Sequence, residues 1–166
     1  MSLESVRAFF AQRAPDIAII ETPDSSATVA QAAAAHGVEP ARIAKTLSLR
    51  IGDRVVLVVA RGDARLDNRK ARAALGGKPR MLDADEVAAI TGHPIGGVCP
   101  FGLATPLPVY CDVSLGAFDE VVPAAGSTHS AVRIAPERMA ALTDAEWVDV
   151  CQDFAGQETR GQDPGA

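Results

Sequence analysis

Two kinds of pattern in the order of apolar and polar residues predict the elements of this chain. Helical spacing, alanine-rich stretches, capping residues and a proline at a first helical position predict helices over residues 2–12, 27–36, 68–75, 84–90 and 136–142. Short β-branched or apolar runs bounded by turn formers predict strands over residues 17–21, 108–112, 120–123 and 131–134. Helices and strands therefore alternate irregularly along the chain.

The clearest pattern is a β-hairpin over residues 43–60, with Gly52-Asp53 at its turn. The first arm alternates, which places Lys45 on the same face as the apolar residues Ile43, Leu47, Leu49 and Ile51. A lysine aimed at a core or cleft is costly unless an anion or a hydrogen-bond acceptor meets it. The alternative is that Lys45 lies at a frayed strand end and extends into water.

Together these elements predict an α+β fold, in which short helices surround a mixed, largely antiparallel β-sheet. We expect one domain over residues 1–154 and a disordered tail over residues 155–166, where the sequence becomes polar and glycine-containing. A Rossmann domain is disfavoured because no glycine-rich dinucleotide fingerprint follows a strand.

Residues 91–103 stand apart because they contain four glycines and two prolines, which exclude an ordinary helix. Such a loop can aim several backbone N–H groups at one point and thereby stabilise an oxyanion or hold a phosphate. A tight turn that only joins two elements explains the same composition.

Charge is distributed unevenly in this chain, whose formal net charge is −5. Residues 42–80 contain eleven Lys or Arg against three Asp, a local charge of +8, and the other residues together carry −13. A basic segment on an acidic protein can hold a phosphate backbone. A solvated surface of mixed charge is the simpler alternative.

Composition excludes several other classes of protein. No apolar run approaches the roughly 20 residues of a membrane span, and the first residues lack a signal-peptide pattern, so we expect a cytoplasmic protein. Three histidines and three cysteines lack metal-ligand spacing, and no Walker-type loop is present, so we expect no metal and no cofactor. Cys99 is interpreted as a small buried residue in preference to a nucleophile, and His36 as structural in preference to catalytic.

Three segments resemble one known family. They are Ile43-Ala44-Lys45-Thr46-Leu47, then Gly96-Gly97-Val98-Cys99-Pro100-Phe101-Gly102, and Gly126-Ser127-Thr128-His129 before a strand. In this order they resemble the YbaK/ProX family of free-standing aminoacyl-tRNA deacylases, whose domain also occurs as the inserted editing domain of bacterial prolyl-tRNA synthetases. The resemblance extends over roughly residues 6–150. It implies a cytoplasmic, metal-independent hydrolase that cleaves the ester joining a wrong amino acid to tRNA.

The resemblance also implies roles for particular residues. Lys45 matches the essential lysine of the family, and the Gly96-x-x-x-Pro100 loop, with Gly97 and Phe101, surrounds the scissile carbonyl. We also expect substrate-binding roles for Thr46, Ser127 and His129, which lie in the matching segments, and for Arg61 and Arg69, which lie in the basic segment 42–80. In this family the substrate's own ribose hydroxyl is thought to activate the water, so a missing protein base is consistent with the activity.

The implied substrate is tRNA-Pro carrying alanine, 2-aminobutyrate, serine or threonine, because a small pocket excludes a larger correct amino acid by steric clash. Prolyl-tRNA synthetase or another synthetase is a possible partner, and we expect neither DNA nor membrane binding. Two alternatives stay open. One is a non-catalytic tRNA-binding or synthetase-associated module, and the other is a small-molecule pocket protein.

Overall fold

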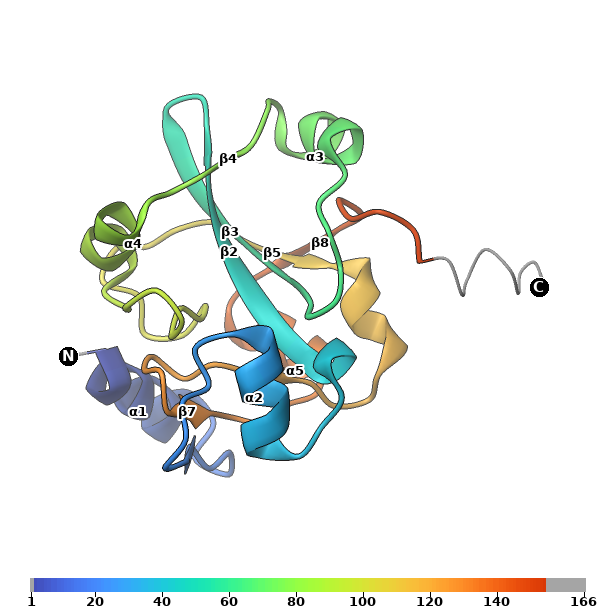
Figure 1. Cartoon of the computed structure of the whole chain (residues 1–166). Coiled ribbons are helices and arrows are strands. Elements are labelled where there is room, and N and C mark those ends of the chain that lie inside the picture. The colour runs from blue at the N-terminus through green and yellow to red at the C-terminus, as the bar shows by residue number, and fades with distance from the viewer. Residues whose placement is uncertain (1, 155–166) are drawn as a thin grey trace.

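A computed structural model describes residues 2–154 and shows five α-helices around a β-sheet (Figure 1). The expected tail, residues 155–166, lies outside the described residues. The helices are α1 (Ser2–Arg13), α2 (Val29–His36), α3 (Asn68–Leu75), α4 (Ala84–Thr91) and α5 (Pro136–Leu142), and two short 3-10 segments cover Pro40–Arg42 and Val113–Ala117. All five predicted helices are confirmed. Helix α2 begins two residues later than expected, because Thr28 is its N-cap and forms a capping box with Gln31.

Eight strands form two sheets. They are β1 (Ile20–Glu21), β2 (Ile43–Ile51), β3 (Arg54–Arg61), β4 (Arg80–Met81), β5 (Val109–Asp112), β6 (Val122–Pro123), β7 (Ser130–Ala131) and β8 (Glu146–Val148). The main sheet has the order β4-β2-β3-β5-β8, with β6 also paired to β2, and β1 pairs with β7 in a small second sheet. The β2–β3 hairpin provides the longest ladder and is antiparallel, whereas β3–β5, β5–β8 and β2–β6 are parallel. The α+β fold with a mixed sheet is confirmed.

Several expected strands are shorter than predicted. The predicted strand 17–21 reduces to β1, because only Ile20 and Glu21 pair, with Ala131 and Ser130. In the predicted strand 131–134 the pairing beyond β7 consists of isolated bridges, from Ala131 to Ala124 and from Ile134 to Val121. Strands β4 and β8 were not predicted. Each has only two or three residues, too few to show an alternation of apolar and polar side chains, and each forms only because it pairs with a strand distant in the sequence.

Strand β2 has a gap along its outer edge. It pairs with β6 at Ile43 and Ala44 and with β4 at Leu49 and Arg50, and the Leu82 N–H donates to the Ser48 carbonyl at 3.1 Å. Among residues 2–154, no strand pairs with the positions of β2 between these contacts on that side. The sheet therefore has an opening in the middle of its longest strand.

The hydrophobic core lies on both faces of the sheet. One cluster joins α1, β3, β5 and α5, and includes Phe10 and Phe101, whose ring centroids are 4.6 Å apart. The second cluster packs α3 against the face of β2 that carries Leu49 and Ile51. A smaller cluster lies under α2. Lys45 shares the β2 face of Leu49, as its alternation predicts.

Candidate active site

A cavity of about 170 Å³ lies at the gap in the edge of β2. Its walls come from four parts of the chain that are distant in sequence: β2, the turn before α2, the loop after α4, and the β6–β7 region. The lining residues used below are Ala27, Lys45, Thr46, Met81, Ile95, Gly96, Val98 and Ser130. The hairpin and the glycine-proline loop, identified separately from the sequence, thus border one cavity.

Two glycines fit the loop between its neighbours. Gly96 has φ +87°, and a Cβ built on it would lie 2.9 Å from the Cβ of Ala27. A Cβ on Gly97 would lie 2.8 Å from the backbone N and C of Ser127. The loop is therefore clamped between the turn before α2 and the turn at residues 126–128, and only glycine allows both approaches.

The ammonium of Lys45 is partly buried and donates a hydrogen bond to the Ala64 carbonyl. Burial lowers the pKa of this amine, an effect that Cys151 and Asp63 oppose and the charge of Arg65 reinforces. An ammonium has three donors, so two protons beyond the Ala64 bond can meet an incoming acceptor. Lys45 therefore has a backbone partner on the α3 side of the sheet while it also lines the cavity.

Thr46 provides an unsatisfied hydroxyl in the cavity wall. Its Oγ1 is buried and has no hydrogen-bond partner within residues 2–154. An unpaired buried polar group costs about 1–3 kcal/mol, so a ligand that bonds this oxygen recovers that energy. Because side chains alternate along a strand, Thr46 and Lys45 project to opposite faces of β2 at the same edge.

The loop offers fewer backbone donors than the sequence analysis expected over residues 97–101. Gly97 already donates its N–H to the Pro94 carbonyl at 2.9 Å, Pro100 has no N–H, and the Phe101 side chain belongs to the core. Within residues 2–154, the N–H groups of Gly96 and Val98, which line the cavity, donate to no protein acceptor. Ile95 also lines the cavity and likewise donates its N–H to no acceptor in this range, so the candidate oxyanion donors of the loop are the N–H groups of Ile95, Gly96 and Val98.

His93 supports the loop from inside and was not singled out in the sequence. Its Nε2 lies 2.7 Å from the Phe101 carbonyl oxygen, and its Nδ1 is buried and has no hydrogen-bond partner among residues 2–154. Burial lowers the pKa of this imidazole, which favours the neutral ring. Cys99 beside it is fully buried and burial raises the pKa of its thiol to about 12, as expected for a packed residue.

The other predicted substrate-binding residues lie outside the cavity lining. Ser127 bonds Ser130, a lining residue, at 2.6 Å between their hydroxyl oxygens. His129 is exposed, with its Nδ1 3.0 Å from the Thr128 hydroxyl. Arg61 is paired with Asp63 at 2.7 Å and lies over the Phe154 ring, and Arg69 is exposed on α3.

Two exposed apolar side chains at the cavity were also missed. Met81 is 55% exposed and Ile95 is 59% exposed, although both line the cavity. Exposed apolar residues beside a pocket are typical of contact with a ligand or partner. Their exposure depends on β4 and on the loop conformation, which no local pattern indicated.

Two further structural features bear on the class of protein. Residues 2–154 contain no group of three or more His, Cys, Asp or Glu placed to hold a metal ion. None of the helices in that range is both long and apolar enough to cross a bilayer.

Comparison with known proteins places the chain among editing domains. The model of the aminoacyl-tRNA editing domain matches residues 23–142. The uncharacterized protein YwhH of Bacillus subtilis (strain 168) is 51% identical over 93% of this chain and 99% of its own length. EbsC of Enterococcus faecalis (strain ATCC 700802 / V583), a proposed Cys-tRNA(Pro)/Cys-tRNA(Cys) deacylase, is 30% identical over 69% of this chain and 71% of its own.

A crystal structure of a proposed trans-editing enzyme for prolyl tRNA synthetase superposes with a TM-score of 0.84. It is 35% identical in sequence, and the match covers 92% of this chain and 98% of that structure. The same fold and the same order of elements are therefore shared along nearly the whole length of both. The chain belongs to the aminoacyl-tRNA editing domain family.

Proposed function

We propose that the protein is a trans-editing hydrolase that removes a small non-cognate amino acid from tRNA-Pro. The observation that supports this most is the cavity in the β2 edge, which joins a partly buried lysine, an unsatisfied hydroxyl and a glycine turn within an editing domain. The named roles of EbsC and of the structural neighbour favour a tRNA-Pro substrate.

The proposed reaction is ester hydrolysis. The water oxygen bonds to the carbonyl carbon, the bond from that carbon to the ribose oxygen breaks, and the ribose oxygen leaves with a proton. Negative charge develops on the carbonyl oxygen, and the N–H groups of Ile95, Gly96 and Val98 are the loop donors available to meet it. Removing one such donor typically lowers the rate by about 10²–10³.

Among residues 2–154, no Asp, Glu or His lines the cavity, so this part of the chain offers no carboxylate or imidazole base there. We assign activation of the water to the neighbouring ribose hydroxyl of the substrate, as the family resemblance implies; this hydroxyl takes a proton from the water and passes its own proton to the leaving ribose oxygen. The two free donors of the Lys45 ammonium then bind the phosphate or backbone of the terminal nucleotide. In this proposal Lys45 positions the substrate and does not itself take the proton.

Cavity size supports a small amino acid. A volume of about 170 Å³ is close to the roughly 150 Å³ of a protein cavity that accepts benzene, so it holds only a few heavy atoms. Selection by steric exclusion is effective, whereas one missing methylene changes binding by only about 1–3 kcal/mol. We propose alanine, 2-aminobutyrate, serine or threonine as the amino acids removed.

The test is a deacylation panel. Transfer RNA for proline is charged separately with each of these four amino acids and with proline, and ester loss is followed with and without protein. We expect acceleration for at least one small amino acid and none for proline. Lys45→Ala should lower that rate by about a hundredfold, since a misplaced substrate loses most of its alignment.

Lys70→Ala is the matched control, because it also removes one lysine but from an ion-paired position outside the cavity. It should retain the wild-type rate. If no mischarged tRNA loses its ester faster than in buffer, the hydrolase proposal is wrong. Salt-dependent tRNA binding without turnover would then support the non-catalytic tRNA-binding module.

A further inference from the structure

The cations of this protein divide sharply into partnered and unpartnered ones. Outside residues 65–80, each Lys or Arg within residues 2–154 has a partner: examples are Arg50 with Glu86 at 3.0 Å, Arg138 with Asp16 at 2.6 Å, and Arg13 over the Phe9 ring. Within residues 65–80, only Lys70 is paired. The cations of the described range with no partner in it are Arg65, Arg69, Arg72, Lys78 and Arg80.

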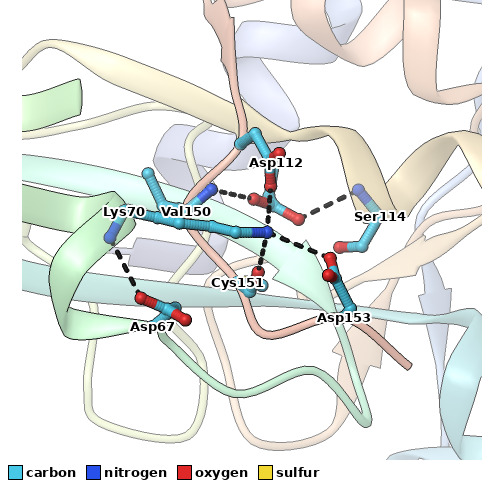
Figure 2. A network of polar contacts seen from close by, with 8 residues as sticks. Asp67, Lys70, Asp112, Ser114, Val150, Cys151 and Asp153 are labelled. Carbon is cyan, nitrogen blue, oxygen red and sulfur yellow. Dashed lines mark hydrogen bonds and ion pairs between the residues drawn. The ribbon is translucent and has the colours of Figure 1, made fainter. Parts of the chain in front are cut away.

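Helix α3 separates the paired lysine from the unpaired arginines. Arg69 and Arg72 are three residues apart, so they lie on one flank of the helix, and both are exposed. Lys70 lies on the other flank, where it bonds Asp149 at 3.1 Å and Asp153 at 3.0 Å, and Figure 2 shows Asp153 beside its ammonium. The carboxylates of Asp149 and Asp153 therefore lie on the Lys70 flank, and no acidic side chain of residues 2–154 lies in hydrogen-bond range of Arg69 or Arg72.

This basic flank is connected to the cavity at two places. Arg65 directly follows Ala64, whose carbonyl accepts the hydrogen bond from the Lys45 ammonium, and Lys45 lines the cavity. At the other end, Lys78 and Arg80 precede Met81, which also lines the cavity, and Figure 1 shows β4 leading from the region of α3 to that of α4. The unpaired cations thus begin beside the cavity and continue onto α3.

We propose that Arg65 with the Arg69 and Arg72 flank of α3 binds the phosphate backbone of the acceptor arm of a tRNA whose aminoacylated end occupies the cavity. This inference rests on the proposed function, and it adds Arg65 and Arg72 to the predicted Arg69. The planar guanidinium binds phosphate in a two-pronged geometry, and an arginine without an ion pair loses no partner when RNA binds. The acidic remainder of the chain repels RNA elsewhere and so favours this one face.

The test measures binding and hydrolysis separately. Binding of an uncharged tRNA-Pro transcript is measured between 50 and 300 mM salt for the wild type and for Arg69→Gln/Arg72→Gln. Each phosphate contact contributes roughly one unit to the slope of log K against log salt, so the double variant should lose about two units of slope and bind several-fold more weakly. Hydrolysis of a short substrate, an amino acid ester of the trinucleotide CCA, should keep its wild-type rate, because that substrate does not reach α3.

Arg7→Gln/Arg13→Gln is the matched control, since it removes the same charge from α1, which lies at the opposite end of the molecule from α3 in Figure 1. It should bind tRNA like the wild type. The proposed tRNA-binding surface is wrong if the α3 variant and the wild type have equal salt slopes, or if the α1 control loses as much slope as the α3 variant. Either result would leave the hydrolase activity itself untouched. Undiminished tRNA binding together with lost binding of a purified prolyl-tRNA synthetase would assign the flank to a protein partner and would also overturn the proposed tRNA-binding surface.

Discussion

Substituting Gly97 by alanine tests whether the loop must be clamped as closely as the structure shows. The new Cβ would lie 2.8 Å from two backbone atoms of Ser127, whereas ordinary contact begins near 3.4 Å. Backbone must therefore move, and a shift of about 0.6 Å restores ordinary contact. The Gly97 carbonyl also accepts the Gly126 N–H at 3.0 Å, so the same displacement strains the hydrogen bond that joins the two segments.

The expected magnitude follows from this geometry. Overpacking of a close contact costs typically about 1–3 kcal/mol, which corresponds to a decrease of about 0.5–1.5 M in the urea midpoint. Deacylation should suffer more. Gly96 and Val98 flank the displaced residue, and a shift near 1 Å in a catalytic group lowers a rate by about a hundredfold.

Gly116→Ala is the matched control, because nothing lies within 4 Å of a Cβ at that position. Urea unfolding and the deacylation rate are measured for both variants under one set of conditions. We expect the Gly116 variant to match the wild type in both. If Gly97→Ala behaves like Gly116→Ala in midpoint and in rate, then the close approach of the loop to the 126–128 turn is not needed, and our account of the site is wrong.

Three further predictions use groups inside the fold. Thr46→Val should leave stability in urea unchanged or slightly higher, because it removes an unpaired buried hydroxyl. If a substrate atom bonds that hydroxyl, the same substitution should lower the deacylation rate by up to about tenfold. Equal rates for the variant and the wild type would refute this role of Thr46. Burial lowers the pKa of His93, so the unfolded chain binds more protons and stability should fall as pH drops from about 6.5 toward the lowered pKa. His93→Gln should weaken that fall in urea titrations, and an identical pH profile would contradict it. Cys99, Cys111 and Cys151 are all buried, and burial raises the pKa of each thiol to about 12. A thiol reagent should therefore label no cysteine in the native protein and all three in denaturant. Rapid labelling of the native protein would refute this prediction.

How much the sequence predicted depended on how local each signal was. The hairpin, the caps of α3 and α4 and the proline that begins α5 are encoded within a few residues, and the structure confirms all of them. The short strand β8 exists only because Glu146, Trp147 and Val148 pair with β5, about 35 residues earlier in the chain. No local pattern could have indicated it.

The same limit applies to the site. Lys45 was noticeable because its polarity broke an apolar alternation, and the glycine-proline loop because of its composition. The part of the cavity wall at Ala27 could not be predicted from the sequence, because its contact with Gly96 joins positions nearly 70 residues apart. The set of loop donors also differs from the expected one, because the Pro94 carbonyl accepts the Gly97 N–H and the unpaired N–H groups at the cavity are those of Ile95, Gly96 and Val98.

Lys45 and Thr46 together explain why the opening in β2 is more than an imperfect sheet edge. Consecutive strand residues project to opposite faces, so the two side chains cannot satisfy each other, and the fold leaves one with unused donors and the other with no partner. Continuing β4 or β6 along this edge would close the opening, and apolar residues at both positions would avoid the cost of burying polar groups. The proposed binding of a polar substrate across that edge would account for why the chain keeps both polar side chains beside a 170 Å³ cavity.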